Sequence, residues 1–183
     1  MQEIRLHGRG GQGVRFAARI LARALFLSGY QTQDFAIYGA ERRGAPVTSF
    51  VRADKKTILE RGYIFEPDIV VLLDDTLNFS SVSGGLKGIM LINSHRKPEY
   101  FSRMRGETSG IGKIYCIDAA QIALRIIGKP IANAAILGAL AKIMSMDMKK
   151  LEEAARMEFE EEGLKEIAQK NIEAAIMCYE AIK

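Results

Sequence analysis

Gly8-Arg9-Gly10-Gly11-Gln12-Gly13 is the stretch that decides the fold of this chain. It follows the short apolar run Ile4-Arg5-Leu6-His7 and precedes an amphipathic stretch from Val14 to Ser28. Glycine tolerates positive φ angles and lets other groups approach the backbone, so this composition predicts a tight turn between a strand and a helix. A helix that begins at such a turn presents free N–H groups and a positive dipole end, which suit an anion. The stretch also matches the dinucleotide pattern G-x-G-x-x-G, although the same turn can serve strand–helix packing alone.

The composition predicts a single well-buried core, because the chain has 183 residues of which 48% are hydrophobic. No apolar run approaches the ~18 residues that a membrane span needs. The first strand begins too close to the N-terminus to leave room for a signal peptide, so we expect a cytoplasmic protein. The net charge of +4 is spread along the chain, unlike the dense basic stripe of a nucleic-acid-binding surface. An acidic ligand or an acidic partner surface fits this charge better.

The cysteines and histidines are too few and too scattered to predict a metal site. Cys116 and Cys178 are the only two cysteines and lack CxxC spacing. This pattern excludes a disulfide framework and a four-cysteine cluster carried by this chain alone. We expect both thiols to be inert core groups, and His7 and His95 to be structural or surface residues. The sequence therefore assigns no catalytic residue and no metal ligand.

The rest of the chain alternates between strand and helix patterns. The expected strands are Tyr30–Ile37, Val47–Arg52, Ile69–Leu73, Ile89–Ile92 and Tyr115–Asp118. After them the apolar period becomes helical and stays so, in residues 119–127, 131–144, 149–160 and 164–182. This alternation predicts an α/β fold: a Rossmann-like, mostly parallel sheet with helices on both faces and a helical C-terminal portion. We expect residues 1–183 to form a single domain.

We expect Asp74 with Asp75, residues 78–85 and Asn133 to have structural roles. Asp74 and Asp75 end an apolar strand, and we expect them to cap the next segment rather than to bind magnesium. Residues 78–85 are expected to form a loop. Asn133 stands near the start of a helix, where capping is the default expectation and a contact with a ligand or partner is the alternative.

The arginines fall into two groups. Arg15, Arg19 and Arg23 recur on one face of the first helix, which we expect to be a solvated surface. Arg42 and Arg43 belong to the loop Tyr38-Gly39-Ala40-Glu41-Arg42-Arg43-Gly44-Ala45-Pro46. Adjacent arginines grip phosphates or carboxylates in a bidentate manner, and the alternative is a surface turn in which Glu41 pairs with one arginine. Because this loop and the glycine turn both follow strands, we expect them to form one shared site at the same sheet edge.

In combination, these motifs resemble the gamma subunit of 2-oxoacid:ferredoxin oxidoreductases, and especially that of the pyruvate enzyme. The resemblance rests first on the glycine turn, on the double-arginine loop and on Val51-Arg52. It continues in Pro67-Asp68, in Asn133-Ala134-Ala135-Ile136-Leu137-Gly138, and in Asn171 with Ala174 and Ala175. Similar residues therefore span nearly the whole chain.

The resemblance implies a multi-subunit enzyme that converts pyruvate and coenzyme A to acetyl-CoA and CO2 and reduces ferredoxin. It also implies that alpha, beta and delta subunits hold the thiamine diphosphate, Mg2+ and iron–sulfur clusters. The gamma subunit would assist assembly and help to bind coenzyme A without supplying catalytic residues. Which 2-oxoacid is used would be decided on the other subunits. The binding residues implied for this chain are Gly8, Arg9, Gly10, Gly11, Gln12, Gly13, Tyr38, Glu41, Arg42, Arg43 and Asn133.

Two other interpretations remain open from the residues alone. The first is a free-standing NAD(P)-dependent oxidoreductase, in which Asp34 stands where a Rossmann enzyme places its ribose-binding acid, about twenty residues after the turn. In that case Arg42 and Arg43 could instead grip a 2′-phosphate. Against it, Arg9 and Gln12 crowd the pyrophosphate position, and the sequence shows no Tyr–Lys pair for hydride transfer. The second is a purely structural subunit whose glycine turn binds no soluble ligand.

Overall fold

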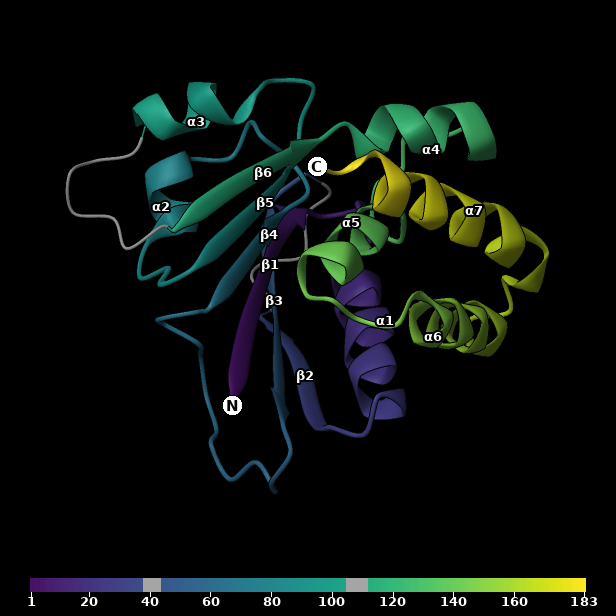
Figure 1. Ribbon diagram of the computed structural model, residues 1–183, viewed down its shortest axis with the longest axis horizontal. Coiled ribbons are helices and arrows are strands. Elements are labelled where there is room, and N and C mark those ends of the chain that lie inside the picture. Colours follow the sequence, from purple (N-terminus) through teal and green to yellow (C-terminus); the bar gives the residue numbers. More distant parts are fainter. Residues whose placement is uncertain (38–43, 105–111) are drawn as a thin grey trace.

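The six strands form one mixed sheet, in a computed structural model that describes residues 1–37, 44–104 and 112–183 (Figure 1). The strand order is β2-β3-β1-β4-β5-β6. The strands are β1 (Gln2–Arg9), β2 (Gln31–Ile37), β3 (Pro46–Asp54), β4 (Ile69–Leu72), β5 (Ile89–Asn93) and β6 (Lys113–Ile117). β1, β4, β5 and β6 pair in parallel, whereas β3 lies antiparallel between β1 and β2. The predicted α/β fold with a mostly parallel sheet is confirmed.

Helices cover both faces of the sheet, as expected. The helices on one face are α1 (Val14–Leu27), α4 (Ala119–Ile127), α5 (Ala135–Ile143), α6 (Met148–Glu161) and α7 (Lys165–Ala181) (Figure 1). The opposite face carries α2 (Phe79–Ser83) and α3 (Pro98–Met104). Successive side chains of a strand point to opposite faces, so Val71 of β4 joins the larger core under α1 and Leu72 joins the smaller core under α2 and α3. Within the described residues, no helix is both long and apolar enough to cross a membrane.

The C-terminal helices pack unusually closely because of one glycine. A Cβ on Gly138 of α5 would lie only 1.7 Å from the backbone oxygen of Ala175 in α7. The backbones of α5 and α7 therefore approach each other closely at Gly138. The helix begins at Ala135 rather than at Ile131, because Asn133 and the residues beside it form a turn.

Residues 78–85 include a helix that the sequence analysis missed. The side chain of Asn78 accepts a hydrogen bond from the backbone N–H of Ser81 at 3.0 Å and caps α2. Five helical residues are too few to show a helical period, so the pattern could not reveal them. Neither Asp74 nor Asp75 caps α2, since Asn78 is its N-cap. Asp74 caps only the turn that follows β4, where its Oδ1 accepts a hydrogen bond from the backbone N–H of Thr76 at 3.0 Å.

The expectation of a solvated arginine face on α1 holds for Arg15, which is exposed, but is wrong for Arg19 and Arg23. Arg19 and Arg23 pair with α6: Nη2 of Arg19 lies 2.6 Å from Oε2 of Glu158, and Nε of Arg23 lies 2.5 Å from Oε1. Glu158 is buried, and Glu161 and Glu162 extend the ion pairs toward solvent. These arginines join two helices that are distant in sequence.

Candidate functional site

The glycine turn has the geometry that its composition predicts. Gly11 and Gly13 have φ angles of 93° and 73°, values that L-residues with side chains rarely adopt. A Cβ on Gly13 would lie 2.2 Å from Nδ2 of Asn133, so the buried Asn133 side chain packs against the start of α1. Asn133 is not the helix cap that we expected, because the N-cap of α5 is Ala134. The structure thus joins two predicted site residues from distant parts of the chain.

Asp74 fixes the turn from the adjacent strand. The side chain of Gln12 folds back over the turn: its Oε1 accepts from the backbone N–H of Arg9 at 2.8 Å, and its Nε2 donates to Oδ2 of Asp74 at 2.7 Å. The same carboxylate lies 3.2 Å from Nε of Arg9 and accepts from Oγ1 of Thr76. Burial by itself would raise the pKa of Asp74, but the hydrogen bonds from Thr76 and Gln12 and the charge of Arg9 lower it below its ordinary value. We call Arg9, Gln12, Asp74 and Thr76 the Asp74 latch.

Arg9 connects the latch to the end of the double-arginine loop. Its Nη1 donates to the carbonyl of Gly44 at 3.1 Å and its Nη2 to Thr76 Oγ1 at 2.8 Å. Two backbone hydrogen bonds join the same segments, from Gly10 N to Ala45 O and from Gly44 N to Gly10 O. β1 and β2 run in the same direction because both are antiparallel to β3, so their carboxyl ends lie at the same sheet edge. The predicted site residues Tyr38, Glu41, Arg42 and Arg43 lie outside the described residues, and their position stays a prediction.

A cavity of about 250 Å³ opens beside the turn. After β1 the chain continues to β2 on one side of the sheet, and after β4 it continues to β5 on the other side. The cavity lies between these two connections, which is the usual place for a ligand in an open α/β sheet. Asp75 in its wall accepts a hydrogen bond from Ser94 Oγ at 2.6 Å. With two carboxylates in its lining, this cavity disfavours a phosphate, whereas the Arg9 side of the turn favours one. The lining residues are Gly11, Gln12, Leu73, Asp74, Asp75, Asn93, Ala120, Pro130, Ile131 and Ala132.

The position of Asp34 gives no support to a dinucleotide site. It pairs with Val51 in the middle of β2 and is exposed, and β3 separates β2 from β1. A Rossmann enzyme needs its acidic residue at the end of the strand beside the glycine turn. The turn itself is filled by the Gln12 side chain. The free-standing NAD(P) enzyme is therefore not supported.

His7 and the two cysteines keep their neutral forms at neutral pH. Burial, with a contribution from the charge of Arg5, lowers the pKa of His7 to about 3, and its Nδ1 lies 3.2 Å from Thr48 Oγ1. Burial raises the pKa of Cys116 and of Cys178 to about 12, so both stay protonated thiols. Among the described residues, no group of three or more His, Cys, Asp or Glu side chains is arranged to hold a metal ion.

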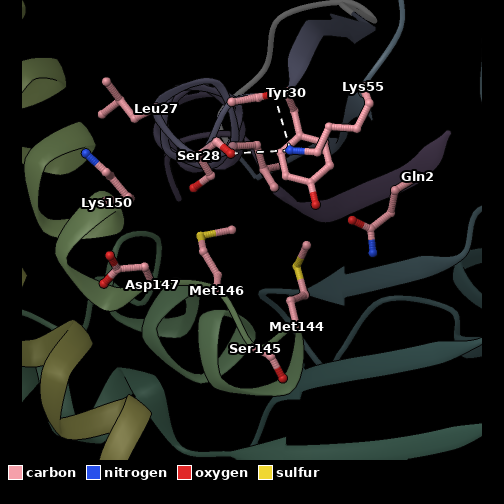
Figure 2. Close-up of a pocket in the computed structure, with 12 residues that line it drawn as sticks. Gln2, Leu27, Ser28, Tyr30, Lys55, Met144, Ser145, Met146, Asp147 and Lys150 are labelled. Atoms are coloured by element: carbon pink, nitrogen blue, oxygen red, sulfur yellow. Dashed lines mark hydrogen bonds between the residues drawn. The ribbon is translucent and has the colours of Figure 1, made fainter.

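A larger cavity, of about 610 Å³, lies at the far end of α1 (Figure 2). Lys55 lines this cavity, and its Nζ donates to the carbonyls of Ser28 and Gly29 and lies 3.6 Å from the centre of the Tyr30 ring. Lys55 thus neutralises the negative end of the helix. Lys150 on the opposite wall pairs with Glu153. Since its charged groups have partners within the chain, we place the candidate site at the glycine turn.

Comparison with known proteins gives a consistent result. The family described as "Pyruvate ferredoxin/flavodoxin oxidoreductase" matches residues 3–181. The "Pyruvate/ketoisovalerate oxidoreductases common subunit gamma" of Pyrococcus furiosus is 44% identical over 185 residues, which cover 98% of this chain and 96% of that protein. "Pyruvate synthase subunit PorC" of Methanothermobacter thermautotrophicus is 41% identical and covers 100% and 97% of the two chains. The crystal structure of pyruvate oxidoreductase subunit PORC from Thermotoga maritima has a TM-score of 0.83 at 34% identity, covering 100% of this chain and 97% of that one.

Proposed function

The chain belongs to the pyruvate ferredoxin/flavodoxin oxidoreductase family, and from this membership we propose that it is the gamma subunit of a multi-subunit pyruvate (2-oxoacid):ferredoxin oxidoreductase. That enzyme converts pyruvate and coenzyme A to acetyl-CoA and CO2 and reduces ferredoxin. The observation that carries the proposal is the match to gamma and PorC subunits along almost the whole of both chains. We propose that residues 1–183 act as a single domain of a cytoplasmic enzyme whose other subunits are alpha, beta and delta.

The iron–sulfur clusters of the reaction do not fit this chain. An iron–sulfur cluster is usually held by four cysteine thiolates. This chain has two cysteines, one in β6 and one in α7, and both thiols stay protonated at neutral pH. We therefore assign the clusters to the partner subunits, and we propose that the same subunits hold the thiamine diphosphate and its Mg2+.

The role that we propose for this chain is to bind an acidic group at the sheet edge. Gln12 and Asp74 hold the glycine turn, so the guanidinium of Arg9 lies at a fixed place beside Gly44. Gly44 and Ala45 belong to the end of the double-arginine loop, and their hydrogen bonds with Gly10 bring that end to the same edge. A guanidinium group binds phosphate oxygens with paired hydrogen bonds. We propose that Arg9, Arg42 and Arg43 contact the phosphates of coenzyme A.

Replacing Arg42 and Arg43 by alanine in the reconstituted enzyme tests this role. Charge-assisted hydrogen bonds contribute about 1.5–3 kcal/mol each, so the apparent KM for coenzyme A should rise at least about tenfold. We expect kcat to change little, because the substitutions leave the reacting centre untouched. A matched control replaces Arg103 of α3 and Arg125 of α4, two exposed arginines away from the glycine turn, and should leave the KM unchanged. The measurement is pyruvate-dependent reduction of ferredoxin at varied coenzyme A.

The outcomes separate three roles. An unchanged KM for coenzyme A in a fully assembled enzyme would rule out the proposed contact of Arg42 and Arg43 with coenzyme A. Loss of the chain from the complex would instead show that the loop is an interface with another subunit. Turnover of pyruvate by the isolated chain would refute the assignment as a gamma subunit.

A further inference from the structure

A strap of irregular chain, residues 58–66, crosses the sheet face opposite α1 on the way from β3 to β4 (Figure 1). Hydrogen bonds fix its course over three neighbouring strands. Gln33 of β2 donates to the carbonyl of Ile58 at 3.2 Å, and Arg52 of β3 donates to the carbonyl of Gly62 at 3.0 Å. Arg5 of β1 reaches the carbonyls of Ile64 and Phe65, each at 3.4 Å. The strap therefore covers the part of the sheet that lies beyond α2 and α3.

The strap holds apolar side chains on both of its sides. Ile58 and Ile64 are buried against the sheet. Leu59, Tyr63 and Phe65 face outward and are 78%, 55% and 73% exposed. The inner pair packs on the sheet, whereas more than half of each outer side chain is exposed to solvent. Exposed apolar side chains gathered at one place mark an interaction site more often than scattered ones do.

The outer side chains continue an aromatic row that begins on the sheet. Phe35 of β2 stacks on Phe50 of β3 with ring centroids 4.8 Å apart. Phe50 stacks on Tyr63 at 6.0 Å, and Tyr63 meets Phe65 edge-on at 6.2 Å. Each ring is thus positioned by its neighbour. The row is a fixed surface rather than a set of independent side chains.

Two buried arginines hold the strap in place. Arg5 and Arg52 are only 8% and 3% exposed, and burying such a group is costly unless it is hydrogen-bonded. Arg52 pairs with Glu3 at 2.8 Å, while Arg5 donates its hydrogen bonds to backbone carbonyls of the strap and of the residues around the end of α2. A segment held this firmly loses little further freedom on binding, which favours association.

The apolar area of the strap is too small to hold two copies of this chain together through the strap alone. An aromatic side chain buries about 150–250 Å² in full and a leucine side chain somewhat less, so the exposed parts of the three outer side chains amount to roughly 350 Å². Two straps face to face would bury about 700 Å², whereas a stable interface needs ~1,200–2,000 Å². A larger partner can extend over the surroundings, where Lys56, Glu60, Arg61 and Glu66 mix both signs of charge. An apolar centre with a rim of mixed charge is typical of a protein interface.

We propose that the strap is the surface on which another subunit of the same oxidoreductase docks. This inference rests on the proposed function, because it takes its partner from the complex. Leu59, Tyr63 and Phe65 form the apolar centre of the interface, and the partner supplies a complementary apolar surface ringed by charges of both signs.

The test replaces Leu59 and Phe65 together by serine in the full chain, co-expressed with the other subunits. A matched control replaces Leu124 of α4 and Met177 of α7, which are also exposed, by serine. The other subunits are purified as a complex through a tag on one of them, and the affinity of each form of this chain for that complex is measured. The affinity should fall at least about tenfold for the strap variant and stay unchanged for the control. Circular dichroism should show both isolated variants folded, because all four side chains lie on the surface.

Each outcome bears on the proposal. Normal binding of the strap variant, or equal loss by the control, would overturn it. Dimers of the isolated wild-type chain that the strap variant abolishes, with unchanged binding to the complex, would assign the surface to a second copy and overturn it as well. If the control binds and the strap variant binds too, the proposed function survives and the docking surface does not. If the wild-type chain itself fails to bind, both proposals fail.

Discussion

Replacing Asp74 by alanine should loosen the glycine turn and lower the stability of the whole domain. The carboxylate accepts hydrogen bonds from Gln12 and Thr76 and pairs with Arg9, and its side chain is only 14% exposed. Without it, the amide of Gln12 and the guanidinium of Arg9 lose their shared partner. Since Asp74 follows β4 and Gln12 precedes α1, the substitution also removes the side-chain link between these two elements.

The expected loss is about 3 kcal/mol of unfolding free energy. A hydrogen bond to a charged group contributes ~1.5–3 kcal/mol, and the partly exposed contacts with Arg9 and Thr76 belong at or below the low end of that range. For a domain of this size, 1 kcal/mol corresponds to about 2–4 °C in Tm, so the midpoint should fall by about 9 °C. Asp75→Ala is the matched control. It removes one hydrogen bond, from Ser94, and should cost about 1.5 kcal/mol, half of the loss expected for Asp74→Ala.

Thermal and urea unfolding followed by circular dichroism measure both changes, and pH gives a second reading. The pKa of Asp74 is lower in the folded chain than in the unfolded chain. Its contribution is therefore complete above the unfolded pKa of about 3.9 and is lost as the pH falls through the folded pKa. The difference between wild type and variant should be constant from pH 8 to about pH 5 and should shrink below about pH 4.

Two results would refute the reasoning. A Tm within about 2 °C of the wild type would mean that the carboxylate does not hold the turn. A stability difference that persists undiminished at pH 3 would mean that the loss has nothing to do with the charge of Asp74.

Three further substitutions test other contacts of the structure. Gly138→Ala places a Cβ 1.7 Å from the Ala175 carbonyl and forces α5 away from α7, so urea unfolding should show a loss of about 3 kcal/mol; a loss below about 1 kcal/mol would contradict the close approach. Gly13→Ala should cost about 2–3 kcal/mol from strain at positive φ and from a clash with Asn133. Adding Asn133→Ala should recover the part of that loss that the clash causes. If no stability is recovered, backbone strain at the positive φ accounts for the whole loss. His7 has a pKa of about 3, so its contribution is complete above about pH 6.5 and is lost as the pH falls; His7→Gln should flatten the pH dependence by about 2 kcal/mol between pH 7 and 5, and parallel curves would disprove it.

The order of the elements was readable from the sequence because it depends on local properties. Positive-φ glycines, alternating apolar residues and helical periods act over a few positions, so the turn at residues 8–13 and the C-terminal helices were predicted close to their observed bounds. The antiparallel direction of β3 was not predicted. A parallel neighbour needs a crossover of a dozen or more residues, and the connection from Ile37 to Pro46 is too short for one. That short connection is the signal from which the antiparallel pairing could have been foreseen.

The candidate site was predicted only in part. Gln12, Arg9 and the glycines were identified, but Asp74 was interpreted as a cap because it ends an apolar strand directly before the next segment. No buried role was predicted for Arg5 or Arg52, because an arginine in a strand pattern normally faces water. Their functions depend on carbonyl and carboxyl groups that lie on other elements, about which a local pattern carries no information.

By itself the sequence determined the glycine turn, the alternation of strands and helices and the family resemblance, since all three are written in neighbouring residues. Only the tertiary structure decided what these pieces do to one another: that Asp74 locks the turn, that Asn133 packs on Gly13, and that two buried arginines hold the strap with its aromatic row outward. The physical reason is that a hydrogen bond or ion pair depends on distances of about 3 Å in space, and residues far apart in the chain reach such distances only once the sheet and its helices have packed.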